Sequence, residues 1–223
     1  MITVNAIGAA MNFETFIETA QPFYRALAAN NSKDWWDANR TTYDKEIKPT
    51  ALALLDEIAP RLSDLLGDPV TTKLFRPHRD TRFSKDKTPY KTHLHVLWQV
   101  NEGRQPVAYF FGIEPDQVRI GGGMIAMEKD VLDDWRKFVD LDAPRVARIV
   151  DGVKTAGFTL RNPELVRVPR GYAPDHPNAD LLRHKSVIAT RPLGGTGPLC
   201  DRIMDGLREF KPLGDLLLSV ACA

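Results

Sequence analysis

The sequence predicts an α+β fold with a central, mainly antiparallel sheet flanked by N-terminal, middle and C-terminal helices. Apolar residues recur at helical spacing in the first third, in a middle segment and near the C-terminus. Residues 92–124 instead alternate between two faces, which is typical of strands. Because the 223-residue chain is 43% hydrophobic and contains no repeat or linker, we expect one domain spanning residues 1–223.

The first third is predicted to be helical. Apolar side chains at near-helical intervals indicate a helix over residues 13–27. Ser32 is a suitable N-cap for a second helix, and Pro49 suits the first turn of a third over residues 50–66. An irregular segment bracketed by two prolines, residues 77–89, is expected to follow.

Residues 92–124 predict three strands of an antiparallel meander, joined by short loops at 101–106 and 114–116. Pairing as tight hairpins would place His95, Gly112 and Arg119 in one row across the sheet. Two interpretations of that face stay open. Small residues at Ala108, Gly112 and Gly121 would either leave a shallow pocket among His93, His95, Gln117 and Arg119, or accommodate a packed helix.

The last hundred residues predict two helices, three short strands and a C-terminal helix that breaks near Pro212. The helices are expected at 129–139 and 144–156, the strands at 158–160, 165–168 and 185–190, and the final helix at 199–220. The triplet Gly121–Gly123 lacks the lysine of a phosphate-binding loop, so we expect a bulge or a tight strand exit there.

Composition gives no sign of a membrane or global nucleic-acid partner, because the formal net charge is only +1. No apolar run approaches the roughly 20 residues of a membrane span, and the apolar start Met1–Met11 resembles a secretory signal only weakly. Cys200 and Cys222 have neither metal-site nor disulfide spacing. We therefore expect a cytoplasmic protein without a cofactor.

The segment from Arg76 to Lys91 concentrates positive charge. It holds six cations and two carboxylates, a formal charge of +4, so the rest of the chain carries −3 of the net +1. Arginine binds phosphate and carboxylate groups bidentately, and lysine adds a mobile point charge. The candidate ligand-binding residues are Arg76, Arg79, Asp80, Arg82, Lys87, Tyr90, Lys91, His93, His95 and Arg119.

The preferred hypothesis is a site for a small phosphorylated or carboxylated ligand, with Tyr90 and His93 as candidate proton donors. In that arrangement Asp80 would orient the Arg79 guanidinium, Arg82 and Lys87 would face the ligand, and Phe83 would anchor the loop in the core.

Two alternatives use the same residues. The loop is either an exposed basic patch for nucleic acid or an acidic protein, or an ion-pair network that only stabilises the fold. His93 and His95 have the spacing of some metal ligands, but no third ligand is apparent, so we predict no metal site.

The cationic segment also resembles the signature RxxRDxRFxxxKxxY of an uncharacterised, mainly bacterial family of chains of about this length. The matching residues are Arg76, Arg79, Asp80, Arg82, Phe83, Lys87 and Tyr90. Further similar segments are 31–36, 91–93, 121–123 and 169–183, so the resemblance spans most of the chain. It implies membership of a family of unknown function and carries over no reaction, substrate or cofactor.

Overall fold

A computed structural model describes residues 13–223, and the apolar start Met1–Met11 lies outside this range. The helices are α1 (Phe16–Ala29), α2 (Lys33–Thr42), the π-helical turn η1 (Tyr43–Ile47), α3 (Lys48–Leu66), α4 (Lys129–Leu141), α5 (Ala143–Thr155), α6 (Ala179–Leu182) and α7 (Leu199–Ala221). The strands are β1 (Val70–Leu74), β2 (Leu94–Val100), β3 (Val107–Ile113), β4 (Val118–Met124), β5 (Thr159–Leu160) and β6 (Val187–Pro192).

The six strands form one sheet in the order β1-β2-β3-β4-β6-β5, and every neighbouring pair is antiparallel. The predicted α+β class is confirmed, as is the meander β2-β3-β4. His95 pairs with Gly112, which pairs with Arg119, so the predicted row across the sheet is also confirmed. Directly opposed residues share a face, which places His95 and Arg119 on the same side of the sheet.

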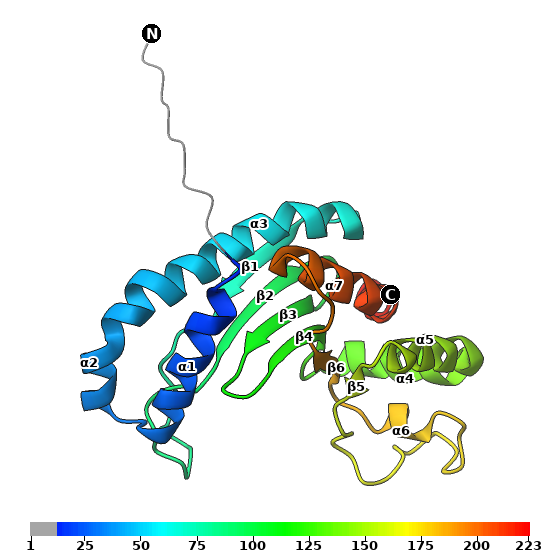
Figure 1. Cartoon of the computed structure of the whole chain (residues 1–223). Helices are drawn as coiled ribbons and strands as arrows, with labels where there is room; N and C mark the ends of the chain where they lie inside the picture. The colour runs from blue at the N-terminus through cyan, green and yellow to red at the C-terminus, as the bar shows by residue number, and fades with distance from the viewer. Residues whose placement is uncertain (1–12) are drawn as a thin grey trace.

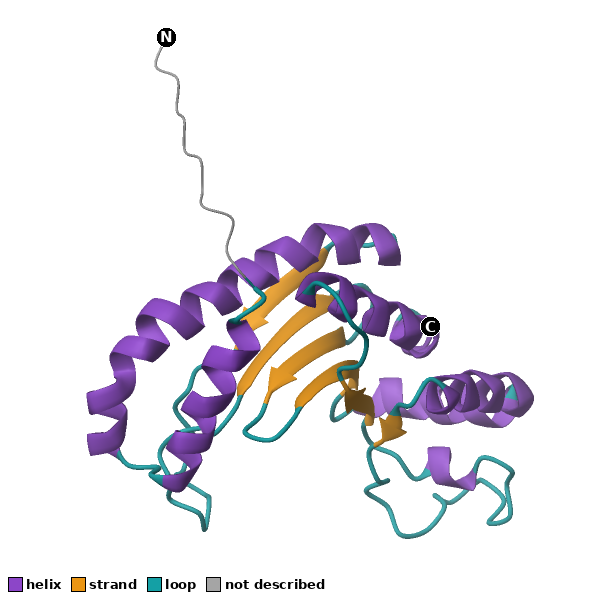
Figure 2. Ribbon diagram, in the orientation of Figure 1, coloured by secondary structure: helices purple, strands orange, loops and turns teal. Residues whose placement is uncertain are grey.

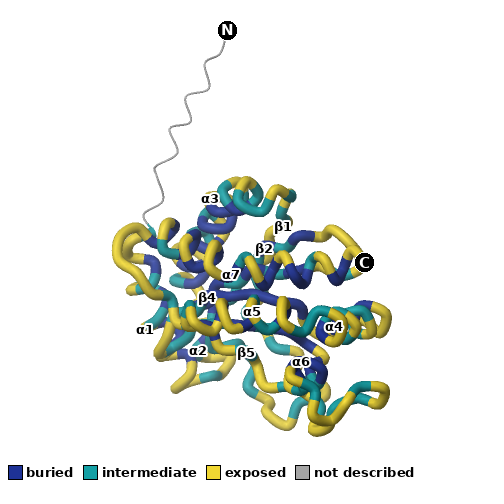
Figure 3. Tube along the Cα trace, turned by 90° about the vertical axis from the view of Figure 1, so that its right-hand side faces the viewer, coloured by how far each residue is buried: buried dark blue, intermediate teal, exposed yellow. Residues whose placement is uncertain are grey.

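One face of the sheet is covered by helices. Helices α3 and α7 pack along it, and α1 packs at β3 (Figures 1 and 2). The β2 side chains on this face are buried, and Trp98 donates its indole N–H to the Leu55 carbonyl oxygen of α3 at 3.0 Å. The buried segments, dark blue in Figure 3, run through the middle of the molecule between sheet and helices.

Some predicted boundaries are wrong. Pro49 lies in the first turn of α3 as predicted, but no break separates this helix from α2, because the π-helical turn η1 joins them. Helix α7 likewise continues through Pro212, since burial of its apolar face against the sheet outweighs the one lost hydrogen bond. Residues 165–168 form no strand, and the edge strand β1 was not predicted.

The glycine triplet lies inside β4 and pairs in unbroken register with β3 and β6, so the expected bulge or strand exit is wrong. A Cβ at Gly122 would lie 2.3 Å from the Ala108 carbonyl oxygen and 2.7 Å from the Phe210 ring of α7. The glycine is therefore needed for close approach of helix and sheet.

The opposite face of the sheet carries the row from His95 to Arg119, and its β2 side chains are only partly buried. Among residues 13–223, the helices that contact strands extensively do so on the other face, so the packed-helix interpretation of this face is wrong. We call this side the open face. The long segments 75–93 and 161–178 extend below the sheet in Figure 1.

Within the described range, no helix is both long and apolar enough to cross a membrane.

Candidate functional site

Residues 75–93 connect β1 to β2, and we call them the cationic loop. Asn31 fixes this loop to the turn between α1 and α2. Its side-chain amide donates to the Tyr90 carbonyl oxygen at 2.8 Å, and its amide oxygen accepts from the Tyr90 N–H at 3.1 Å. The neighbouring Ser32 caps α2 as predicted, by accepting from the Trp35 N–H. Trp36 then stacks on the Tyr90 ring, with centroids 4.5 Å apart. Segments 31–36 and 76–91 thus meet in space.

Tyr90 is buried, with 5% of its surface exposed. Burial, reinforced by Asp37, raises the pKa of its phenol above the ordinary value. Stacking and backbone bonds give this residue a positioning role in the loop.

Arg79 is held within the loop rather than by Asp80. Its guanidinium donates to the Asp86 carboxylate and to the Thr88 hydroxyl. The Thr88 N–H and hydroxyl also bond to Asp86, and the N–H of Thr88 followed by the Arg79 guanidinium lowers the pKa of Asp86 to about 2. The expected orientation of Arg79 by Asp80 is wrong, because Asp86 supplies the carboxylate.

Asp80 pairs instead with Arg82, whose Nε lies 3.0 Å and Nη2 2.7 Å from its two oxygens. Lys87 donates to the Thr81 carbonyl oxygen at 2.9 Å. Phe83 is 97% exposed, so its predicted anchoring in the core is wrong: it lies at the loop tip, with the Arg82 guanidinium 5.9 Å from its ring. Three signature cations therefore have partners within their own loop.

A second group of cations has no such partner. Among the described residues, no carboxylate oxygen lies within 4 Å of the charged groups of Lys73, Arg76 or Lys91. The Lys73 and Lys91 amines lie 5.0 and 4.9 Å from the centre of the Phe75 ring. Burial, then Arg76 and Lys73, lower the pKa of Lys91. We call Lys73, Arg76 and Lys91 the Lys91 cluster.

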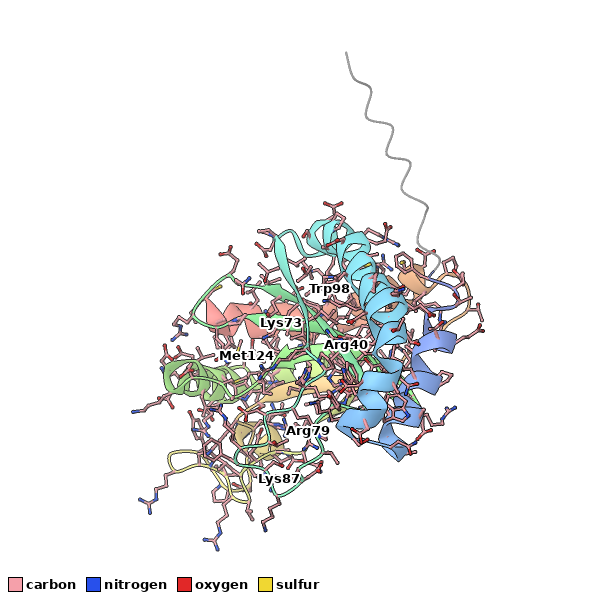
Figure 4. All side chains as sticks on the ribbon, turned by 90° about the vertical axis from the view of Figure 1, so that its left-hand side faces the viewer. Arg40, Lys73, Arg79, Lys87, Trp98 and Met124 are labelled. Atoms are coloured by element: carbon pink, nitrogen blue, oxygen red, sulfur yellow. The ribbon has the colours of Figure 1, made fainter. Side chains whose placement is uncertain are left out.

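Figure 4 shows where one cation of the Lys91 cluster and two cations of the loop lie. Lys73 lies on β1, whereas Arg79 and Lys87 follow further down the loop.

His93 and His95 form a stacked pair on the open face, with ring centroids 3.8 Å apart. Burial, followed by the neighbouring cation Lys91, lowers the pKa of His93. Burial, His93, Lys91 and Arg119 lower the pKa of His95 to about 3. Glu114 lies 3.9 Å from His95 Nε2, too far to hydrogen-bond and offset that burial. Both imidazoles are therefore neutral at pH 7.

Arg119 completes the row on the far side of Gly112. Its Nη2 donates to the Thr190 hydroxyl of β6, while its buried Nε has no hydrogen-bond partner. His95 Nε2 is likewise buried without a partner. A Cβ at Gly112 would lie 2.9 Å from the His95 ring, so the missing side chain gives that ring its place over the strand.

Four pockets adjoin this arrangement. The one of about 610 Å³ is lined by Phe75, Arg76 and Tyr90 together with residues of α2, η1 and α3. Another of about 480 Å³ is lined by Arg79, Asp86, Thr88, Tyr90, Lys91 and His93, among others. A third of about 340 Å³ lies on the open face beside His95, and a fourth of about 450 Å³ lies beside Arg119 and Glu114. The pocket on the open face differs from the predicted one: of the four expected wall residues it includes only His95, and its floor is at Ala108, Gly122 and Gly123.

Sequence reasoning missed Lys73, Phe75 and Glu114. The run Val70–Leu74 is rich in β-branched side chains, which favour strands, but three polar residues in a row interrupt any alternation. Recognising that strand would have placed Lys73 opposite Leu97 on the open face. The described residues contain no group of three His, Cys, Asp or Glu side chains arranged to hold a metal ion.

Comparison with known proteins finds the chain in one family. A family model described as conserved hypothetical protein (DUF2461) matches residues 19–215, which include the whole sheet, the cationic loop and most of α7. No curated protein matches the chain. Because the match covers most of the sequence, the chain belongs to the DUF2461 family of conserved hypothetical proteins.

Proposed function

We propose that the protein binds a small phosphorylated or carboxylated ligand at the Lys91 cluster, next to the open face of the sheet. The observation that carries this proposal is that the Lys73 and Lys91 amines lie 5.0 and 4.9 Å from one aromatic ring, while among the described residues no carboxylate oxygen lies within 4 Å of either amine or of Arg76. Burial, followed by the charges of Arg76 and Lys73, lowers the pKa of Lys91. We therefore assign anion binding to Lys73, Arg76 and Lys91, which lie where the loop joins the sheet, rather than to Arg79, Arg82 and Lys87 further along the loop.

Electrostatics favours this choice among the cations of the loop. Like charges about 4 Å apart repel by about 1 kcal/mol even in bulk water, and by more near a protein surface. Arg79 and Arg82 are relieved of such repulsion by Asp86 and Asp80. Among the described residues, the cations of the Lys91 cluster form no such ion pair, and the charge of Arg76 acts on the Asp80 carboxylate only from beyond 4 Å, so we expect a bound anion to stabilise them most.

The pocket of about 480 Å³ that Lys91 lines leaves room for an anionic group next to its amine. His93 lines it as a neutral imidazole, able to donate or accept a hydrogen bond. Tyr90 is assigned a positioning role, because its ring is stacked on Trp36. The proposal is of a binding site, and it assigns no reaction.

A thermal-shift screen of phosphorylated and carboxylated metabolites tests the proposal, because a ligand that binds only the folded state raises the melting temperature. We expect at least one anion to stabilise the wild type and to lose its effect in Lys91→Met. The matched control is Lys85→Met, which removes the same charge from the same loop outside the cluster. Equal loss in both variants, or loss in Arg82→Met alone, would contradict the assignment to the Lys91 cluster.

Phe83 favours one alternative, a site for single-stranded nucleic acid at the loop tip. An aromatic ring that is 97% exposed beside Arg82 is suited to stack on a base. Binding of an oligonucleotide that is weakened by Phe83→Ala and falls steeply with salt, by about 0.7 log units per log unit of salt for each phosphate contacted, would support this alternative. A small anion bound at the Lys91 cluster should be insensitive to Phe83→Ala.

A further inference from the structure

An apolar pocket on the open face begins where the Lys91 cluster ends. Phe75 belongs to both: the two lysine amines lie within 5.0 Å of its ring, and the ring lines the pocket of about 340 Å³. The other apolar side chains that line this pocket are Leu97, Phe110, Ile125 and Ile188. A ligand with its charged group at the lysines would therefore have apolar surface directly beside it.

The floor of this pocket is low because it is built from residues with little or no side chain. Ala108 contributes one methyl group, and Gly122 and Gly123 contribute backbone. Gly123 has φ of +142°, and a Cβ there would lie 2.0 Å from the Val187 carbonyl oxygen, so a larger residue is excluded. The hollow is a consequence of strand pairing between β4 and β6.

The apolar pocket is lined by uncharged residues, in contrast to the cations of the Lys91 cluster. His95 forms part of its wall and is uncharged above a pKa of about 3. Ile125 at the end of β4 is 64% exposed, which leaves apolar surface uncovered at the pocket. Positive charge adjoins two of its wall residues: Lys73 and Lys91 lie against the Phe75 ring, and Arg119 donates to the Thr190 hydroxyl.

We propose that the ligand of the Lys91 cluster is an organic anion with a compact apolar body, which fills the pocket between Phe75 and Ile188 while its anionic group meets Lys73 and Lys91. This inference rests on the proposed function and narrows its ligand class. A volume of about 340 Å³ lies at the lower end of the range for small-molecule sites, so the body is of the size of one or two rings.

Three probes separate the two halves of such a ligand. Naphthalene-1-acetate carries both an anionic group and an apolar body, 1-naphthaleneacetamide lacks the charge, and acetate lacks the body. Titration calorimetry of the full chain should show naphthalene-1-acetate binding at least tenfold more tightly than either of the others. Lys91→Met should reduce its affinity to that of the amide.

A pocket variant tests the location of the body. Ala108→Leu fills the floor of the pocket while leaving the Lys91 cluster in place, and should weaken naphthalene-1-acetate at least tenfold without changing acetate binding. Ala173→Leu is the matched control, because the same enlargement falls on an exposed loop residue. Thermal unfolding shows whether each variant is folded. If the Ala108→Leu variant does not fold, the location of the naphthalene ring is tested on the wild type instead. Intermolecular NMR contacts between naphthalene protons and the methyl groups of Leu97, Ile125 and Ile188 are then expected.

The outcomes separate this inference from the proposed function. If anions bind in a Lys91-dependent manner, but naphthalene-1-acetate binds no more tightly than acetate or shows no contact with these methyl groups, the apolar body is wrong and the anion site stands. If none of the probes and no anion in the thermal-shift screen binds, both proposals are wrong. Tight binding that needs both Lys91 and the open pocket supports both.

Discussion

The ionisation of His95 is coupled directly to folding. Its pKa falls from an ordinary 6.5 to about 3 through burial, followed by the charges of His93, Lys91 and Arg119. Below pH 6.5 the unfolded chain takes up a proton that the folded protein does not, so the folded state loses stability as pH falls toward 3. Above pH 6.5 both states are neutral and the effect vanishes.

We therefore predict that the free energy of unfolding falls by up to about 1.4 kcal/mol for each pH unit below 6.5 through His95 alone. The measurement is urea unfolding of wild type and His95→Gln between pH 7 and 5, above the range where most carboxylates titrate. The variant should show a shallower fall. Identical slopes for the two proteins would mean that His95 is protonated as readily in the folded state as in the unfolded chain.

Asn31 carries a second residue-scale prediction, because one side chain satisfies both backbone groups of Tyr90. Asn31→Ala leaves a part-buried N–H and C=O without these bonds, and should lower the free energy of unfolding by about 2 kcal/mol. Asn30→Ala is the control, since the Asn30 side chain bonds only to the Ala26 carbonyl oxygen in an exposed position. We expect it to stay within about 0.5 kcal/mol of wild type. Equal effects would contradict the role of Asn31.

At this scale the sequence revealed which residues are charged but not which of them pair. Asp80 is next to Arg79 in the chain, yet it bonds to Arg82, because two backbone steps bring that guanidinium back over the carboxylate. Arg79 reaches Asp86 only because the loop folds back on itself between them. Such pairings depend on the backbone path, which local pattern does not determine.

At the scale of elements, contact between α7 and the sheet depends on a glycine in β4. A methyl group at Gly122 would collide with Ala108 backbone and with the Phe210 ring, so Gly122→Ala should destabilise the protein by about 1–3 kcal/mol. Gly152 of α5 provides the contrast, because a Cβ there would meet nothing within 4 Å. Gly152→Ala should stabilise by about 0.5–1 kcal/mol through helix propensity. Denaturant unfolding of both variants is the measurement, and a Gly122→Ala variant as stable as the wild type would contradict the need for a glycine at this contact.

Elements with strong periodicity were predictable, and those governed by tertiary packing were not. Residues 94–100, 107–113 and 117–121 alternate between two faces, so short connecting loops were enough to predict the row from His95 to Arg119. Strand β1 is short and lies at the sheet edge, where pairing with β2 decides its conformation. Pro212 signals a helix end locally, but burial of α7 along the sheet overrides it.

For the whole molecule, the main consequence is an uneven distribution of positive charge. Within the cationic loop, Arg79 and Arg82 form ion pairs with Asp86 and Asp80, whereas among the described residues no carboxylate lies within 4 Å of the Lys91 cluster. The sequence could indicate the charged segment. It could not separate these two parts, because Lys73 reaches the cluster from a different element.

The most direct test is an NMR titration of the Lys91 side chain in low-salt buffer, without and with sulfate, which stays dianionic while lysine titrates. We predict a pKa for Lys91 below the ordinary 10.5 that rises when sulfate is added, and rises less with chloride at equal ionic strength. In Arg76→Met the starting pKa should already be higher. A pKa of 10.5 in the wild type, with the same response to sulfate and chloride, would contradict an anion site at the Lys91 cluster.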